Sequence, residues 1–435
     1  RANRPHEALE ILEALPPSHE EAVRAALCGL AYRLLGRRDL AEQKSAEALC
    51  SPGGHPMAWR LAGLLAEDAG VMDSAQHAFT EAIRVDPSWG LPRADQSRVL
   101  LAIGKRQEAL EELEKAFILS PTEPEISTAY FERMFAADPP PQAEELFREA
   151  VRLHPEDRRL RFLWIAALLK RERHDEAMNE IEEAMAVFPV DDGMLQSALA
   201  VRRRVGPMGP KPAGSSPPRV SACLIVKNEE SRLPRALLSL RGLVDEIIIV
   251  DTGSTDRTRP IAEALGARVF ATAWNDDFAA ARNVGLAQAS GEWILILDAD
   301  EEIAPQDHET LRRLVTSRRN KKAAFRLTTR NYTEECGARG WVANDGSYPD
   351  LERGSGWFPS AKVRLFPRDP RIRFVYPVHE VVEPTLRELG IPILEGDVPI
   401  HHYGRLDKAR LIEKGKTYLS LGLKKLDQLG DDPTA

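Results

Sequence analysis

The stretch Trp293-Ile-Leu-Ile-Leu-Asp298-Ala-Asp300-Glu301-Glu302 decides the fold of the second half of this chain. Its apolar run predicts a buried strand, and two carboxylates, one residue apart, follow at its carboxyl end. Alternation along an extended backbone predicts that Asp298 and Asp300 lie on the same side. In open α/β sheets, ligands bind beyond the carboxyl ends of strands, where short acidic side chains can reach a phosphate-bound divalent cation. A turn or a helix N-cap is the alternative interpretation of this pattern.

Three further segments upstream predict a sheet of several parallel strands. Val220-Ser-Ala-Cys-Leu-Ile-Val226 and Asp245-Glu-Ile-Ile-Ile-Val250 are short apolar runs that end in polar loops, and 267–270 is a third strand candidate. Apolar residues at helical spacing predict helices over 231–242, 256–266 and 278–289. Alternating strands and helices favour a parallel α/β sheet, so the polar strand ends should meet at one edge, which is the geometry of a nucleotide site.

These segments resemble the family 2 glycosyltransferases of GT-A fold. The matching stretches are CLIVKNEE at 223–230, IIIVDTGSTD at 247–256 and DFAAARNVGLAQASGEWILILDADEEI at 277–303. A later portion resembles the carboxyl-terminal half of family members that carry tetratricopeptide repeats. It comprises Lys362-Val-Arg364-Leu-Phe366, Val378-His379-Glu380 and Ile400-His-His402-Tyr-Gly404.

The resemblance implies a nucleotide-sugar donor, with a UDP-sugar as the first candidate. Val226, Asn228 and Glu229, at the first strand end, would then border the nucleobase. Asp251, at the second strand end, would accept a hydrogen bond from a uracil-type imide; ordering of its own loop is the alternative role. Arg282 lies in a segment that the family assigns to the donor pocket.

The resemblance also implies a metal ion at the donor diphosphate. Asp300 would hold Mn²⁺ or Mg²⁺ between the two phosphates, while Asp298 would face the ribose or support the metal indirectly. His402 matches the family position of a later metal ligand, and alternation predicts that His401 points the opposite way. Arg364 is a second candidate for the diphosphate, because guanidinium pairs well with phosphate oxygens.

Inversion at the anomeric carbon requires a carboxylate near the acceptor. Glu380 resembles the family's acceptor-side residue and is the first candidate for this general base, with Glu301 and Glu302 as alternatives. A salt-bridged structural role is the competing interpretation of Glu380.

The amino-terminal half is a repeat. Pro87, Pro121, Pro155 and Pro189 stand 34 residues apart, and each follows a helix with small or apolar residues at fixed offsets. This is the tetratricopeptide period, in which a proline ends each second helix and small residues let paired helices approach closely. One unit cannot bury its own apolar face, so several must stack.

The predicted fold class is therefore α plus α/β: an all-α tetratricopeptide solenoid followed by a GT-A domain with a Rossmann-like mixed sheet. We place the solenoid at 1–205, a Pro/Gly-rich linker at 206–218, the GT-A domain at 219–405 and a helical extension at 406–435. Asp431-Asp-Pro433 resembles the start of another repeat, so the native chain is expected to extend further.

Composition restricts the partners. The formal charge of −8 in 435 residues is spread over both signs, which argues against a nucleic-acid partner. No apolar run approaches the ~20 residues of a membrane span. The four cysteines lack metal or disulfide spacing, and a reducing cytoplasm suits them.

The resulting hypothesis is a metal-dependent inverting glycosyltransferase whose repeats present a protein or peptide acceptor. A lipid-linked or cell-surface glycan acceptor, and a non-catalytic scaffold with a degenerate sugar-nucleotide module, are the alternatives. The repeats could also build a homo-oligomer. A zinc peptidase is disfavoured because His379-Glu380-Val-Val-Glu383 lacks the second histidine, and a nucleotidyltransferase because the first strand ends without a Gly-rich basic loop.

Overall fold

A computed structural model describes residues 4–15, 21–50, 55–136, 140–206, 218–317, 323–407, 411 and 415. The chain divides into two compact units, Arg1–Glu172 and Arg173–Ala435. Most of the predicted linker and of the predicted helical extension lies outside the described residues.

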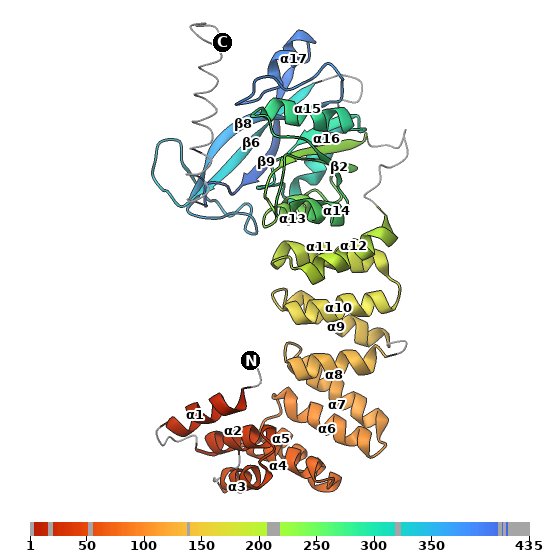
Figure 1. Ribbon diagram of the computed structural model, residues 1–435, viewed down its shortest axis with the longest axis vertical. Helices are drawn as coiled ribbons and strands as arrows, with labels where there is room; N and C mark the ends of the chain where they lie inside the picture. The colour runs from red at the N-terminus through yellow and green to blue at the C-terminus, as the bar shows by residue number, and fades with distance from the viewer. Residues whose placement is uncertain are drawn as a thin grey trace. The chain divides into compact units, whose positions relative to one another are not determined.

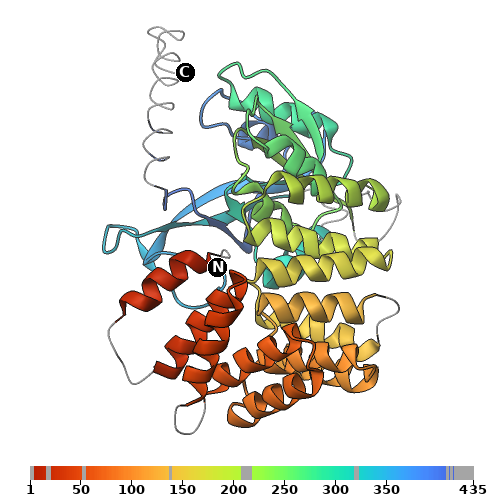
Figure 2. The same cartoon turned by 60° about the horizontal axis from the view of Figure 1, so that its bottom comes forward.

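The first unit is a stack of paired helices, as the repeat period predicts (Figures 1 and 2). Each second helix ends shortly before the repeat proline. The helices are α1 (Pro5–Ala14), α2 (Glu21–Leu34), α3 (Arg38–Leu49), α4 (Pro56–Asp68), α5 (Met72–Val85), α6 (Gly90–Ala102), α7 (Arg106–Leu119), α8 (Pro124–Met134), α9 (Pro141–Leu153) and α10 (Arg158–Lys170).

Small residues at the repeat positions make these helix pairs close. Ala75, Ala82, Ala109 and Ala116 are fully buried. A Cβ atom added at Gly63 would lie 2.5 Å from Phe79 Cε1, so no larger side chain fits at this crossing without repacking.

The last helix pair, α11 (His174–Val187) and α12 (Asp192–Val205), belongs to the second unit. This division lies earlier than the predicted boundary at 205/206, because both helices pack on helices α13 and α14 of the α/β domain. Arg202 Nε donates to the carbonyl oxygen of Ala264 at 2.9 Å, and Arg241 Nη2 donates to Glu183 Oε1 at 2.7 Å. Glu182 pairs with both arginines.

The parallel half of the sheet follows the predicted strand–helix order. Its strands are β1 (Val220–Val226), β2 (Glu246–Asp251), β3 (Arg268–Ala271) and β4 (Trp293–Ile296), and its helices are α13 (Leu233–Ser239), α14 (Thr258–Ala264) and α15 (Phe278–Gln288). β1 pairs in parallel with β2 and with β4, and β2 with β3. The carboxyl ends of β1 and β2 meet, since Val226 lies opposite Asp251.

The remaining strands turn this into a mixed sheet, which confirms the predicted fold class. They are β5 (Glu301–Glu302), β6 (Ala324–Thr333), β7 (Val342–Ala343), β8 (Gly356–Pro367) and β9 (Ile393–His402), with α16 (His308–Ser317), α17 (Glu383–Glu388) and a 3₁₀ turn at Pro305–Asp307. The described strands run in the order β3-β2-β1-β4-β8-β6-β9-β5, with β7 on β8. β8 is antiparallel to both β4 and β6, and β9 is parallel to β6.

The helices within the described ranges are all too short or too polar to cross a lipid bilayer.

Candidate active site

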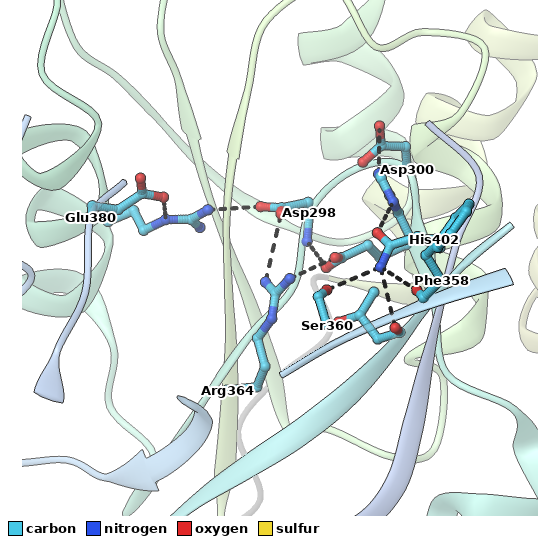
Figure 3. A network of polar contacts seen from close by, with 11 residues as sticks. Asp298, Asp300, Phe358, Ser360, Arg364, Glu380 and His402 are labelled. Atoms are coloured by element: carbon cyan, nitrogen blue, oxygen red, sulfur yellow. Dashed lines mark hydrogen bonds and ion pairs between the residues drawn. The ribbon is translucent and has the colours of Figure 1, made fainter. Parts of the chain in front are cut away.

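The acidic segment after β4 is a turn. β4 ends at Ile296, and the backbone N–H of Glu301 donates to the carbonyl oxygen of Asp298 at 3.1 Å. The expectation that Asp298 and Asp300 share one side of an extended strand is therefore wrong, because the chain reverses between them. The two carboxylates meet different partners (Figure 3).

Asp298 lies in a chain of alternating charges. Arg282, from α15, donates to Glu380 Oε1 through Nε and to Asp298 Oδ1 through Nη2, each at 2.8 Å. Arg364 comes from β8. Its Nη1 lies 3.6 Å from Asp298 Oδ2, and its Nη2 donates to Glu301 Oε1 at 2.6 Å. Both arginine side chains are buried, so each ion pair offsets the cost of removing a charge from water.

The pKa shifts follow from this arrangement. Burial alone would lower the pKa of Arg282, but Asp298 and Glu380 raise it, so the guanidinium stays charged. Burial alone would raise the pKa of Asp298, yet Arg282 and Arg364 lower it well below its usual range. Arg282 and Asp298 are thus both ionised, whereas burial raises the pKa of Glu301.

The loop that carries Glu380 is fixed on α15. Asn283 Nδ2 donates to the carbonyl oxygen of Phe374 at 2.9 Å, and its Oδ1 accepts from the N–H of Phe374 at 2.8 Å. The N–H of Phe278 donates to the carbonyl oxygen of Pro377. These bonds hold the 374–380 segment where Glu380 reaches Arg282.

Asp300 meets His402 through strand pairing. β5 is antiparallel to β9, with Glu301 opposite His402, and the N–H of Tyr403 donates to the carbonyl oxygen of Asp300 at 3.2 Å. His402 Nε2 lies 3.5 Å from Asp300 Oδ2. Burial alone would lower the pKa of His402, but Asp300 raises it. His401 lies on the other face, as alternation predicts, with Nδ1 2.8 Å from Tyr332 Oη.

Asn331 on β6 holds the other edge of the His402 ring, a role that sequence patterns did not indicate. Its Oδ1 lies 2.8 Å from His402 Nδ1. Its Nδ2 donates to the carbonyl oxygens of Phe358 at 2.8 Å and Thr329 at 3.3 Å, and to Ser360 Oγ at 3.0 Å (Figure 3). The ring is therefore oriented from both sides.

The residues predicted to border the nucleobase lie in two interlocked loops after β1 and β2. Asn228, at a positive φ of 55°, accepts from the N–H of Thr255 at 2.8 Å. The N–H of Glu229 donates to Thr258 Oγ1 at 2.7 Å. Asp251 Oδ1 accepts from the N–H of Ser254 at 3.0 Å, so it also orders its own loop.

Arg364, predicted to bind the diphosphate, is engaged by two carboxylates and is buried. Two buried guanidinium atoms, Nε of Arg364 and Nη1 of Arg282, have no hydrogen-bond acceptor among the described residues. Both guanidiniums therefore keep donor capacity beyond the charge chain.

The polar loops at the edge of the parallel sheet, together with a carboxylate–imidazole pair supplied by a late strand, belong to a mixed-sheet α/β domain that follows a helical-repeat array in the sequence. Residues 221–350 match the model of glycosyl transferase family 2, so the chain contains a family 2 glycosyltransferase domain.

Individual proteins show the same likeness. A TPR repeat-containing protein of Synechococcus elongatus is 38% identical over 209 residues, which cover 46% of each chain. An uncharacterized glycosyltransferase of Rickettsia felis is 41% identical over 88 residues, 20% of this chain and 31% of that one. The crystal structure of S. aureus TarS 1-349 aligns with a TM-score of 0.29 and 21% identity over 43% of this chain and 60% of that one. The chain spans less than half the length of these two curated relatives.

Proposed function

We propose that the chain is an inverting, metal-dependent glycosyltransferase that moves a sugar from a nucleotide diphosphate to a protein or peptide acceptor. The observation that carries the proposal is the approach of Asp300 Oδ2 and His402 Nε2 to 3.5 Å, next to the charge chain. A UDP-sugar is the proposed donor, with its base between the loops that carry Asn228, Glu229 and Asp251.

The pair fits a cation that completes its coordination with phosphate. Within the described ranges, no three or more His, Cys, Asp or Glu side chains are grouped to hold a metal. Mg²⁺ is commonly held by one or two carboxylates together with substrate phosphates. Asp300 and His402 would hold Mn²⁺ or Mg²⁺, which when bound offsets the charge on the departing diphosphate.

The proposed base is Glu380. Its Oε1 accepts from Arg282, whereas Oε2 accepts no hydrogen bond within the described part of the chain. A carboxylate with one oxygen fixed and the other open is suited to accept a proton. The acceptor's nucleophilic atom would bond to the anomeric carbon, the bond from that carbon to the phosphate oxygen would break, and the acceptor's proton would move to Glu380.

The repeats supply a surface for the acceptor. A cavity of about 420 Å³ in the first unit is lined only by residues of α2, α4, α6 and α8. Three arginine–carboxylate pairs line this cavity: Arg33–Asp68, Arg60–Asp95 and Arg98–Glu67, each with a nitrogen–oxygen distance of 2.6 Å. Leu34 is 58% exposed beside them. Mixed charge with an exposed leucine suits a peptide, and repeat arrays form extended concave surfaces of this kind.

A panel of nucleotide sugars with Mn²⁺ tests the donor half. We expect one donor to be hydrolysed slowly to free nucleotide, and Asp300→Ala to abolish that release. Release that survives Asp300→Ala contradicts the metal assignment. Failure of every nucleotide sugar to bind, with or without divalent ions, contradicts the enzyme itself and favours the scaffold alternative.

A matched pair of surface variants tests the acceptor half. Leu34→Asp adds a charge inside the repeat cavity, whereas Leu119→Asp adds one to α7, at a position that is 41% exposed and outside the cavity lining. We expect Leu34→Asp to reduce transfer to peptide without changing donor hydrolysis, and Leu119→Asp to change neither. Equal transfer by both variants removes this cavity from acceptor binding.

A further inference from the structure

The side-chain amide of Asn331 has only one orientation that satisfies its neighbours. The carbonyl oxygens of Phe358 and Thr329 lie 2.8 and 3.3 Å from Nδ2, and carbonyl oxygens only accept hydrogen bonds. With the amide reversed, its oxygen would face both of them. The amide oxygen must therefore face His402.

This orientation fixes the tautomer of His402. Nδ1 lies 2.8 Å from Asn331 Oδ1, an atom that only accepts, so Nδ1 must carry a proton. In a neutral imidazole, Nε2 then presents its lone pair. His402 Nε2 and Asp300 Oδ2 lie 3.5 Å apart, so two electron-pair donors face one another.

Gly404 keeps the space beside these donors open. A Cβ atom at this position would lie 2.6 Å from His402 Nε2 and 3.0 Å from Asp300 Oδ2. The histidine ring cannot easily move aside, because Asn331 holds its far edge. A side chain at residue 404 would therefore occupy the position from which both donor atoms are reached.

We propose that Asn331 and Gly404 preform the cation site: Asn331 is a positioning residue that keeps the Nε2 lone pair of His402 directed at Asp300, and Gly404 leaves room for the ion there. The inference rests on the proposed function, because it takes the Asp300–His402 pair as the place where a divalent cation binds. Asn331 donates no group to the ion. It acts through the imidazole, as hydrogen-bond partners of metal-bound histidines commonly do.

The tautomer can be read without metal or substrate. In the full-length, metal-free chain labelled with ¹⁵N-histidine, long-range ¹H–¹⁵N spectra at a pH where His402 is neutral report which ring nitrogen carries the proton. His402→Gln assigns the resonance by its loss. We expect the Nδ1–H form in the wild type, a mixture in Asn331→Ala, and the Nδ1–H form again in Ser360→Ala, which keeps both carbonyl partners of the amide. The Nε2–H form in the wild type overturns the proposal.

Mn²⁺ binding, followed by the electron paramagnetic resonance of the free ion, is the second readout. We expect Asn331→Ala to weaken binding roughly 10–100-fold, and Ser360→Ala to leave it within about twofold. Gly404→Ala should abolish uptake. Gly193→Ala, where a new Cβ meets nothing closer than 3.5 Å, should not change it. Circular dichroism verifies that each variant is folded.

The outcomes separate the two proposals. If the wild type binds Mn²⁺ through Asp300 and His402 but Asn331→Ala and Gly404→Ala bind equally well, the positioning inference fails while the metal assignment stands. If the wild type shows the Nδ1–H form but takes up no Mn²⁺, the metal assignment fails and the inference falls with it.

Discussion

Arg282 Nε donates to Glu380 Oε1 at 2.8 Å, although 98 residues separate the two in sequence. The same guanidinium reaches Asp298, so one side chain joins the proposed base to the acidic turn. Its position in α15 therefore couples two parts of the proposed site.

Replacing Arg282 should destabilise the fold. Arg282→Ala leaves Glu380 without its cation and leaves Asp298 with Arg364 alone, and we expect the free energy of unfolding to fall by roughly 3 kcal/mol. Arg282→Lys keeps the charge but cannot donate to both carboxylates with fixed geometry. Its free energy of unfolding should therefore fall, but by less than that of Arg282→Ala. Urea denaturation measures both. Arg259→Ala, which removes an exposed pair with Glu263, should leave the urea midpoint unchanged; an equal shift there would show that the Arg282 effect is not specific.

Glu246 should make the fold acid-sensitive. Burial alone would raise the pKa of Glu246, but hydrogen bonds from Ser221, Ser290 and Gly291 lower it below 4.5, the ordinary value for a glutamate. A depressed pKa in the folded state stabilises the protein above about pH 4.5, and this contribution is lost as the pH falls through the lower folded value.

Glu246→Gln tests this contribution. We expect a loss of roughly 1–3 kcal/mol at pH 7 that shrinks as the pH falls below 4.5. Thermal unfolding across a pH series gives the comparison. The exposed Glu309→Gln should show no such trend, and a Glu246→Gln deficit that stays constant with pH would contradict the assignment.

The four cysteines should react in two classes. Cys50 and Cys336 are exposed, whereas Cys28 and Cys223 are buried. Burial raises the pKa of Cys28 and raises that of Cys223 to about 12, so little reactive thiolate forms at either. With Ellman's reagent at pH 8, two thiols should react quickly in the native chain and two more only after denaturation. Labelling of native Cys223, located by mass spectrometry, is the outcome that counts against this burial.

A fragment that begins at residue 173 should keep the second compact unit intact, whereas a fragment that begins at residue 206 should be less stable. Removing residues 1–172 keeps α11 and α12, with Arg202 on Ala264 and Glu183 on Arg241. Removing 1–205 exposes the faces of α13 and α14 that these helices cover. We expect a lower melting temperature and weaker cooperativity for 206–435 than for 173–435, measured by calorimetry. Identical melting of the two fragments would restore the boundary near 205.

Local patterns in the sequence predicted the parallel strands, the helix pairs and the opposite faces of His401 and His402, because each depends on periodicity within a short segment. The sequence left the reversal after Ile296 open, with a turn as the alternative, since an acidic run after a strand is compatible with extended and turned backbone alike. The contacts of Arg282 with Glu380 and of Asn331 with His402 depend on packing between distant elements. The assignment of α11 and α12 to the second unit depends on packing of the same kind: their repeat pattern matches that of the preceding pairs, but their side chains contact Arg241 and the carbonyl oxygen of Ala264.

The pairing of β5 with β9 has a consequence for protein synthesis. A ribosome makes Asp300 well before His402, so a nascent chain carries the acidic turn while the strand that completes it has yet to be translated. Products of premature termination before β9 contain the residues of the parallel strands and of the loops after β1 and β2 but lack the imidazole. Under the proposed mechanism, sugar transfer therefore requires translation past Gly404. Polypeptides that end before this residue cannot transfer sugar.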